Sequence, residues 1–396
     1  MDAAPRLVAV TVVVSLAAGG AAGRASSGFE RSLDAALNAV ALPRSSEGMQ
    51  ARYNAGRSLE DLVYAERRGC AGSLGQALIL AHGLVRWAEG YDRPRPILEG
   101  AGRAQTLAAA RRVRRRCRPA DDVVGLVRRS PALPTLPPLV AAAPPGARNT
   151  ALAARLASLG RRFPGYAAIW THDLRTGRVA GWNTDARFPA ASTVKLGVLL
   201  ATLARLRHPE RSPLDYDLRA LASWSSNLAA NRLVERFGVS ATQAALRRAG
   251  AWRSTYPQEY RVGTGRADVV RQPPLVSARV TTARDLGRLL YVLHAGAFGS
   301  RAARIATGLD AAHAQYGLRL LLASELRGNN VGLVRPFVPA ATPVAQKNGW
   351  IHDARHTAAI VYGPDAPRIV VILTYAPNLR LATARRLARA VMSALR

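Results

Sequence analysis

The pattern of apolar positions changes from helical to mixed at a proline-rich stretch near residue 130. Before it, between residues 29 and 124, Ala and Leu recur with helical spacing. Beyond it, strand-like alternation and helical spacing take turns. Expected strands are 166–173, 179–183, 344–350, 357–362 and 368–375, and expected helices are 150–162, 192–206, 228–237, 241–249, 282–293 and a last one from about 381. This order predicts an α+β fold, in which an antiparallel five-stranded sheet is covered by helices and carries an inserted helical subdomain.

The N-terminus and the proline-rich stretch indicate how the chain is divided. Arg6 precedes an apolar run from Leu7 to Ala18 and then small residues up to Gly23, the order of a secretory signal. The run is short and broken by glycine, so a membrane span is disfavoured, although an uncleaved anchor remains open. The expected units are a signal segment at 1–25, a helical N-terminal region at 26–128, a Pro-rich linker at 129–149 and the main domain at 150–396. We therefore expect a secreted protein, or one associated with the cell wall or periplasm.

The only two cysteines, Cys70 and Cys117, both fall in the N-terminal region. In an exported chain the oxidising compartment favours their pairing, and we expect one disulfide between them. A pair of free thiols is the alternative. Two cysteines so far apart do not indicate a zinc site.

The charge is unusual in amount and in kind. The chain has 56 Lys+Arg against 25 Asp+Glu, a net charge of +31, and only two of its cations are lysine. Such a charge suits a polyanionic partner such as nucleic acid, an anionic membrane or a wall polymer, but coding bias with solvated arginines explains it too. The densest cluster, between Arg111 and Arg118, has the pattern of a solvated helix face. Because arginine is used at all other such positions, Lys195 and Lys347 indicate sites that need a compact or titratable cation.

Lys195 lies one helical turn after a serine. In Pro189-Ala-Ala-Ser192-Thr-Val-Lys195 the hydroxyl is at the expected start of a helix, and the amine three residues later faces the same side. The helix is apolar nearly all round, so burial would lower the pKa of Lys195 and allow a neutral amine to act as base for Ser192. Because Ser-x-x-Lys alone is a weak pattern, a lysine snorkelling to the surface is the alternative.

Two further polar segments follow. The triplet Ser-Ser-Asn at 225–227 could supply a proton-passing hydroxyl and an amide for a substrate, although alone it is most simply a helix N-cap. The segment Gln-Lys-Asn-Gly-Trp at 346–350 ends an expected strand, where Lys347 could attract a carboxylate and Gly349 leaves room for substrate. Alone, the segment is also consistent with a lysine on an edge strand whose charge prevents pairing with another chain.

In order, Ser-x-x-Lys, Ser-x-Asn about thirty residues later and Lys-x-Gly on a late strand resemble the motif set of penicillin-binding proteins and class A β-lactamases. The resemblance covers about 150–396 and extends to the flanking Phe-Pro-Ala-Ala before the serine, Ser-Asn-Leu-Ala-Ala-Asn, and Thr-Thr-Ala-Arg-Asp-Leu. It implies the fold of that family and a serine hydrolase that works through an acyl-enzyme. The N-terminal region lies outside it.

The resemblance implies roles in acylation. Ser192 would be the nucleophile, Lys195 its base or proton relay, and Ser225 the proton shuttle to the leaving nitrogen. The backbone N–H groups of Ser192 and Trp350 would form the oxyanion hole, aimed where negative charge develops.

It also implies roles in substrate binding. Asn227 would hold the side-chain amide of the substrate, and Lys347 its carboxylate beside Gly349. The family's Lys-Thr-Gly or Lys-Ser-Gly is here Lys-Asn-Gly, so a hydroxyl is lost, and the Asn348 amide could replace it.

The larger departure from the family's pattern concerns the carboxylate that hydrolyses the acyl-enzyme in class A enzymes. Class A enzymes carry a Glu, with Asn four residues later, before the Thr-Thr segment. Here the corresponding stretch, 251–280, offers only Glu259 and Asp268, without that asparagine. Glu259 is a weak candidate and Asp268 a weaker one.

No metal or cofactor is expected. The histidines considered as metal ligands lack such spacing and are expected on the surface or in the core: His294, His313, His352 and His356. The function expected first is hydrolysis of a β-lactam or related cyclic amide. The alternatives are a penicillin-sensitive D-Ala-D-Ala peptidase or esterase, and a non-catalytic wall-associated penicillin-binding module. The expected partners are a β-lactam or peptidoglycan-like substrate and an anionic wall polymer, for a monomer that binds no nucleic acid.

Overall fold

The computed structural model describes residues 132–212, 214–257, 279–324 and 328–396, with scattered positions between 35 and 56. The elements of this part are α6 (Thr150–Arg161), β1 (Tyr166–Asp173), β2 (Val179–Trp182), β3 (Phe188–Pro189), α7 (Lys195–Leu203), η3 (Pro209–Arg211), α8 (Asp215–Ser223), α9 (Asn227–Phe237), α10 (Val239–Arg248), β4 (Val280–Thr281), α11 (Ala283–Phe298), α12 (Arg301–Thr307), α13 (Ala311–Leu322), η4 (Gly328–Val331), η5 (Arg335–Phe337), β5 (Val344–Ile351), β6 (Ala354–Tyr362), β7 (Pro367–Tyr375) and α14 (Leu381–Ala394). The expected signal segment and both cysteines lie outside the described residues. None of the helices described is long and apolar enough for a membrane span.

The five-stranded antiparallel sheet predicted from the alternating pattern is confirmed, with the order β2-β1-β7-β6-β5. β1 and β7 pair along their whole length, from Tyr166 opposite Tyr375 to Asp173 opposite Arg368. Pairing of the first long strand with the last brings the two ends of the domain together. β5 carries the segment 346–350 and lies at an edge of the sheet, where one side of its backbone is not used for pairing.

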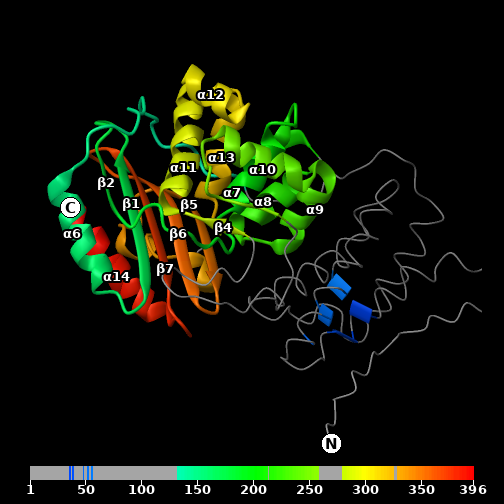
Figure 1. Ribbon diagram of the computed structural model, residues 1–396. Coiled ribbons are helices and arrows are strands. Elements are labelled where there is room, and N and C mark those ends of the chain that lie inside the picture. Colours follow the sequence, from blue (N-terminus) through cyan, green and yellow to red (C-terminus); the bar gives the residue numbers. More distant parts are fainter. Residues whose placement is uncertain are drawn as a thin grey trace, which may run out of the picture.

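One face of the sheet is covered by α6 and α14, which lie side by side (Figure 1). Their inward side chains pack on the residues of β1 and β7 that point to this face, such as Ile169. Leu156 of α6 and Val391 of α14 are fully buried there. The start of α6 is fixed by Asn149, whose Oδ1 accepts a hydrogen bond from Leu152 N at 3.0 Å.

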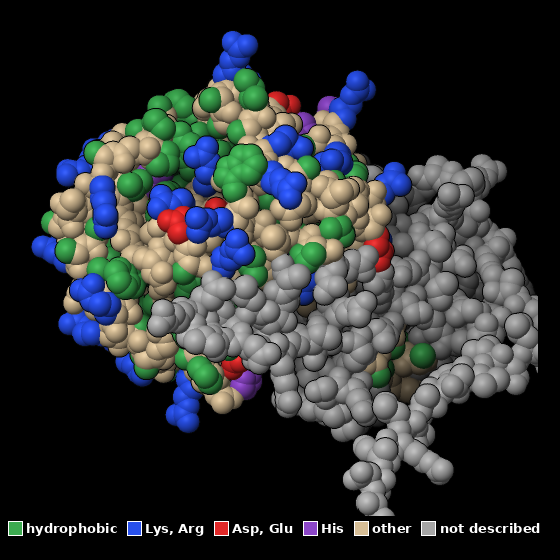
Figure 2. Space-filling view, in the orientation of Figure 1, with side chains coloured by type: hydrophobic (Ala, Val, Ile, Leu, Met, Phe, Trp, Pro, Cys, Tyr) green, Lys and Arg blue, Asp and Glu red, His purple; other side chains and the backbone are tan. Residues whose placement is uncertain are grey.

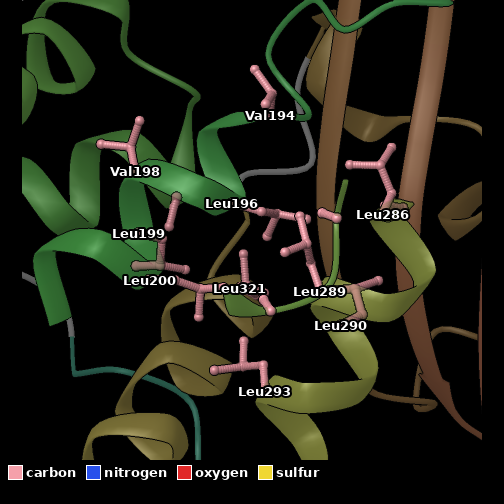
Figure 3. Close-up of a cluster of buried hydrophobic side chains, with 14 of the residues drawn as sticks. Val194, Leu196, Val198, Leu199, Leu200, Leu286, Leu289, Leu290, Leu293 and Leu321 are labelled. Atoms are coloured by element: carbon pink, nitrogen blue, oxygen red, sulfur yellow. The ribbon is translucent and has the colours of Figure 1, made fainter. Parts of the chain in front are cut away.

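The opposite face is covered by the inserted helices. α7, α11 and α13 meet in a cluster of aliphatic side chains (Figure 3), whose members include Leu196, Leu199, Leu200, Leu289, Leu293 and Leu321. Every residue of α7 is buried. The apolar pattern of this helix therefore predicts its environment correctly, and Lys195 is the one residue of α7 with a charged side chain in that environment.

Residues 132–149, expected as a linker, form an extended strap along the main domain. The Arg319 guanidinium donates to the carbonyls of residues 133–134 at 3.1 and 3.0 Å. His294 Nε2 lies 3.1 Å from Val140 O, and the last residues of the strap bond to β2 and the turn before it. The extended conformation agrees with the proline content. The docking on the domain is a tertiary feature that the composition does not indicate.

Two local features are not apparent from the sequence pattern. β3 and β4 pair over only two residues each, too few for a periodicity to be visible. α8 has polar residues on its inner side: Asp215 is fully buried, accepts a 2.7 Å bond from Arg219 and another from Tyr316. These polar partners conceal the apolar spacing by which a buried helix is normally recognised.

Candidate active site

Ser192 lies in a tight turn ahead of α7. Ala191 has a φ of 46°, and the bonds from Lys195 N to Ser192 O (3.2 Å) and from Leu196 N to Thr193 O (3.1 Å) span three residues, as in a 3₁₀ helix. The helix expected from Ser192 is therefore α-helical only from Lys195 onward. Residues three apart eclipse each other in such a turn, so Ser192 and Lys195 share one side.

The turn is held by contacts on either side of Ser192. Thr193 Oγ1 donates to Ala190 O at 2.6 Å, and Ala190 N donates to Arg279 O at 3.0 Å. His356 Nε2 lies 2.8 Å from Pro189 O, which ties the turn to β6. A serine fixed in this way would lose little further freedom in the reaction expected of it.

In the Ser-Ser-Asn triplet, the middle residue caps a helix and the outer two contact the lysines of the site. Ser226 is the N-cap of α9, and its Oγ accepts from Ala229 N at 3.1 Å. Ser225 has a φ of 66°, a left-handed conformation that costs a serine about 1–3 kcal/mol and is found mainly at functional sites. The N-cap reading is therefore right for Ser226, which leaves Ser225 and Asn227 to contact the two lysines.

Lys195 does not reach the surface. Its side chain is fully buried, and Nζ donates to Ser225 O at 2.5 Å and to Asn227 Oδ1 at 2.7 Å. The snorkelling alternative is therefore wrong. Burial of an amine requires such partners, because an unpaired one would lose its hydration without compensation.

Lys347 approaches the same serine from β5. Its Nζ donates to Ser225 Oγ at 2.5 Å and to Asn348 O at 3.1 Å, and only 1% of the side chain is exposed. One lysine thus contacts the carbonyl of Ser225 and the other its hydroxyl. This arrangement can stabilise a serine oxygen while it carries negative charge.

The backbone of β5 passes directly beside Ser192. A Cβ at Gly349 would lie 3.0 Å from Ser192 N and 3.0 Å from Thr193 N, closer than nearly all side chains allow. Glycine therefore lets the strand come within reach of the turn. The next residue, Trp350, is half-buried, and its ring lies 6.0 Å from the Arg355 guanidinium carbon. This closeness agrees with an oxyanion hole formed by the N–H groups of Ser192 and Trp350, which stays a prediction.

Asn348 points to the side of the sheet opposite Lys347. Side chains alternate along β5, so Asn348 lies on the other side of the sheet from Lys347 and Gly349. Its Nδ2 donates to Asn330 O at 2.5 Å, and its Oδ1 accepts from Thr357 Oγ1 at 2.6 Å. The expectation that this amide replaces the family's hydroxyl in the cleft disagrees with the geometry, which favours a structural role.

Asn330, in η4, is a positioning residue that the sequence does not indicate. Its Nδ2 donates to Ser223 O at 2.6 Å, at the end of α8, while its carbonyl receives the bond from Asn348. It therefore connects the loop of Ser225 to β5. The surrounding Gly-Asn-Asn reads only as a turn in the sequence.

The histidines considered as ligands are separate from one another. His356 is buried, which lowers its pKa to about 4, and its Nδ1 accepts from Thr374 N at 3.3 Å, as a neutral ring does. Burial also lowers the pKa of His294, whereas His352 is exposed. Within the described residues no group of at least three His, Cys, Asp or Glu side chains could hold a metal ion.

The remaining predicted residues cannot be placed. Glu259 and Asp268 lie in the stretch 258–278, and Cys70 and Cys117 in the N-terminal region, all outside the described residues. The deacylating base and the disulfide stay predictions.

Solved structures with the same architecture include two forms of PBP-A. The chain superposes on "Structure of PBP-A" with a TM-score of 0.51 and 18% identity, over 64% of this chain and 98% of that one. For a PBP-A mutant in an acyl-enzyme complex with penicillin G the TM-score is 0.52, with 18% identity over 64% and 99% of the two chains. A mutant class A β-lactamase of the last common ancestor of Gram-negative bacteria gives 0.50 and 23%, over 62% and 98%. The superpositions establish the fold, and at identities this low they establish nothing beyond it. No curated protein sequence gives a significant match.

The family follows from the sequence model that fits the domain. The model of the beta-lactamase enzyme family matches residues 151–216 and 202–395, which include all three motifs and nearly the whole main domain. The chain belongs to this family. The resemblance inferred from the order of its motifs is therefore confirmed.

Proposed function

We propose that the protein is an exported serine hydrolase that opens a β-lactam, or a related cyclic amide, through an acyl-enzyme on Ser192. The observation that carries this proposal is the convergence of Lys195 and Lys347 on Ser225, with Ser192 one turn from the first lysine. Membership of the family supports the same chemistry.

Acylation would proceed by transfer of one proton across the site. Ser192 Oγ attacks the amide carbonyl while Lys195 accepts its proton, and the developing oxyanion is held by backbone N–H groups. As the C–N bond breaks, Ser225 gives its proton to the leaving nitrogen and is reprotonated from Lys195. Lys347 keeps its charge beside the Ser225 hydroxyl and attracts the substrate carboxylate.

Deacylation decides between the leading function and its alternative. A lactamase needs a base that activates water against the ester, and the candidate Glu259 lacks the family's accompanying asparagine. The groups for acylation are brought together in the described site. A penicillin-sensitive D-Ala-D-Ala peptidase or esterase is therefore the second candidate, in line with the penicillin G acyl-enzyme of the similar PBP-A fold. A non-catalytic wall-associated module is the third.

One experiment separates these functions. The purified protein is incubated with a chromogenic cephalosporin, and intact-mass spectra are taken over time beside Ser192→Ala. Colour change without a lasting adduct supports the lactamase, and a persistent adduct that Ser192→Ala lacks supports the peptidase or the module. A peptidase is then recognised by release of D-alanine from a D-Ala-D-Ala peptide. If neither turnover nor an adduct appears, the proposed acyl-enzyme is wrong.

The same spectra test the predicted export. Protein recovered from the culture medium should lack the signal segment 1–25, and its mass should rise on alkylation only after reduction if Cys70 and Cys117 are paired. A full-length mass in the membrane fraction would indicate an uncleaved anchor, whereas a full-length mass in the cytoplasmic fraction alone would contradict export.

A further inference from the structure

The helix layer on the outer side of the sheet has arginine as its only charged residue. The stretches 150–162 and 380–396, which contain α6 and α14, hold eight arginines and no Asp or Glu. Coding bias can explain why these cations are arginine, but it does not explain why acidic residues are absent. The exposed members include Arg155, Arg161, Arg162, Arg386, Arg389 and Arg396, which we call the arginine face.

These arginines are exposed, and the two helices that carry most of them pack side by side. In Figure 2, Lys and Arg side chains without neighbouring acidic ones follow the left rim of the domain, where Figure 1 shows α6 and α14. In the part of the chain that the structure describes, no arginine of this face forms an ion pair. The positive charge of this face is therefore not neutralised by acidic side chains of the described residues, and it is available to an anionic partner.

Two of the guanidinium groups are oriented by aromatic rings. Arg161 lies over Trp182 at 5.2 Å, and Arg389 lies over Phe337 at 5.5 Å, measured to the ring centroids. Stacking restricts the side chain while the N–H donors at the edge of the guanidinium remain free to bind an anion. The planar fork of donors matches the oxygens of a phosphate group.

We propose that the arginine face binds a linear phosphodiester polymer of the cell envelope, and so holds the enzyme at the wall. The face lies on the opposite side of the sheet from α7 and the Ser192 turn. A bound polymer would therefore leave the cleft open to substrate. This inference concerns attachment, and it does not depend on the activity proposed for Ser192.

The surroundings of the face favour such a polymer over nucleic acid or a membrane. Both helices lie flat on the sheet, so neither can enter a major groove, and the two aromatic rings are covered by guanidinium groups rather than open for base stacking. A helix that inserts into a membrane needs an apolar outer side, but Leu387, Val391 and Met392 of α14 are buried. The exposed large hydrophobic side chains in the described residues lie elsewhere, at Trp252, Phe298 and Ile305.

Binding to labelled poly(glycerol phosphate), measured by fluorescence anisotropy on the full chain, tests the proposal. The quadruple variant Arg155→Gln, Arg161→Gln, Arg386→Gln and Arg389→Gln should bind at least tenfold more weakly than wild type. The slope of log K against log salt should also be shallower for the variant, since fewer phosphate contacts release fewer counterions.

A control with the same change of net charge removes exposed arginines of α10 and α12: Arg247→Gln, Arg248→Gln, Arg301→Gln and Arg304→Gln. Binding by the control should fall by twofold or less. Equal losses in the two variants, or no binding by wild type, would overturn the proposal. So would tighter binding of wild type to duplex DNA or to phosphatidylglycerol vesicles at the same salt concentration. Thermal melting and adduct formation with a labelled penicillin should be the same in both variants, which separates this result from a failure of the proposed activity.

Discussion

At the scale of single residues, the surroundings of Lys195 suit an amine and exclude a guanidinium. Lys195 Nζ fits between a carbonyl and an amide oxygen at 2.5 and 2.7 Å in a space with no access to solvent. A guanidinium is broader, is planar and stays protonated, so it could neither occupy this space nor accept a proton from Ser192. The use of lysine at this position in a chain of arginines thus has a physical reason.

We expect Lys195→Arg to lower the rate of acylation by about 10²–10⁴-fold, the usual contribution of a positioned general base. Lys347→Arg keeps a positive charge for the substrate carboxylate but disturbs the 2.5 Å contact with Ser225 Oγ. We therefore expect its acylation rate to fall by about tenfold. Stopped-flow measurement with a fluorescent penicillin gives both rates. An unchanged rate in Lys195→Arg would remove the case for a titratable amine.

Part of the site could be predicted from the sequence, because some of its residues are recognisable from their immediate neighbours or from their residue type. Ser192 and Lys195 could be paired because they lie three positions apart, within one helical turn, and Lys347 could be singled out because it is one of only two lysines. Asn330 could not, because its role depends on contacts with Ser223 and Asn348, which are distant from it in sequence. Asn348 was assigned to the cleft because the motif gives its residue type but not the direction of its side chain.

At the scale of elements, the site depends on the approach of β5 to the start of α7. Both backbones must come together for the N–H groups of Ser192 and Trp350 to point at one oxygen. Gly349 makes this possible, since a Cβ there would lie 3.0 Å from Ser192 N. Neither element by itself contains the site.

Gly349→Ala should therefore separate the strand from the turn and lower the acylation rate at least tenfold. The free energy of unfolding should fall by about 1–3 kcal/mol. Gly296→Ala in α11 is a matched control, because its Cβ would meet only ordinary contacts from 3.6 Å upward. The control should acylate like wild type in the same stopped-flow assay. Equal rates in both variants would show that the close approach is not needed.

At the scale of the whole molecule, stability depends on histidines that folding keeps neutral. Burial lowers the pKa of His172 and of His356 to about 4, whereas the unfolded chain binds a proton near pH 6.5. The unfolded state thus binds more protons between these values, and stability must fall as the pH falls. His172 is fully buried beside Trp170 and Tyr291. Within the described structure neither ring nitrogen has a hydrogen bond of good geometry, and the nearby backbone of Ala143 offsets only part of the effect of burial on its pKa.

His172→Phe should consequently flatten the decline of the free energy of unfolding between pH 6.5 and 4, by up to about 1.4 kcal/mol per pH unit. Above pH 7 the variant should be at least as stable as wild type, since the buried ring nitrogens that it removes have no hydrogen bond of good geometry within the described structure. Urea unfolding at several pH values measures both effects, with the exposed His352→Phe as control. A slope equal to that of wild type would contradict a neutral buried His172.

The sequence by itself determined the five strands, most of the helices around them and the family, because alternation, helical spacing and short ordered motifs are local properties of a chain. Only the tertiary structure decided that Lys195 and Lys347 meet at Ser225, that the strap 132–149 lies on the domain, and that α6 and α14 form one arginine face. These features join segments up to 230 or so residues apart, and their relative placement follows from the packing of the sheet and its two helix layers rather than from any local pattern.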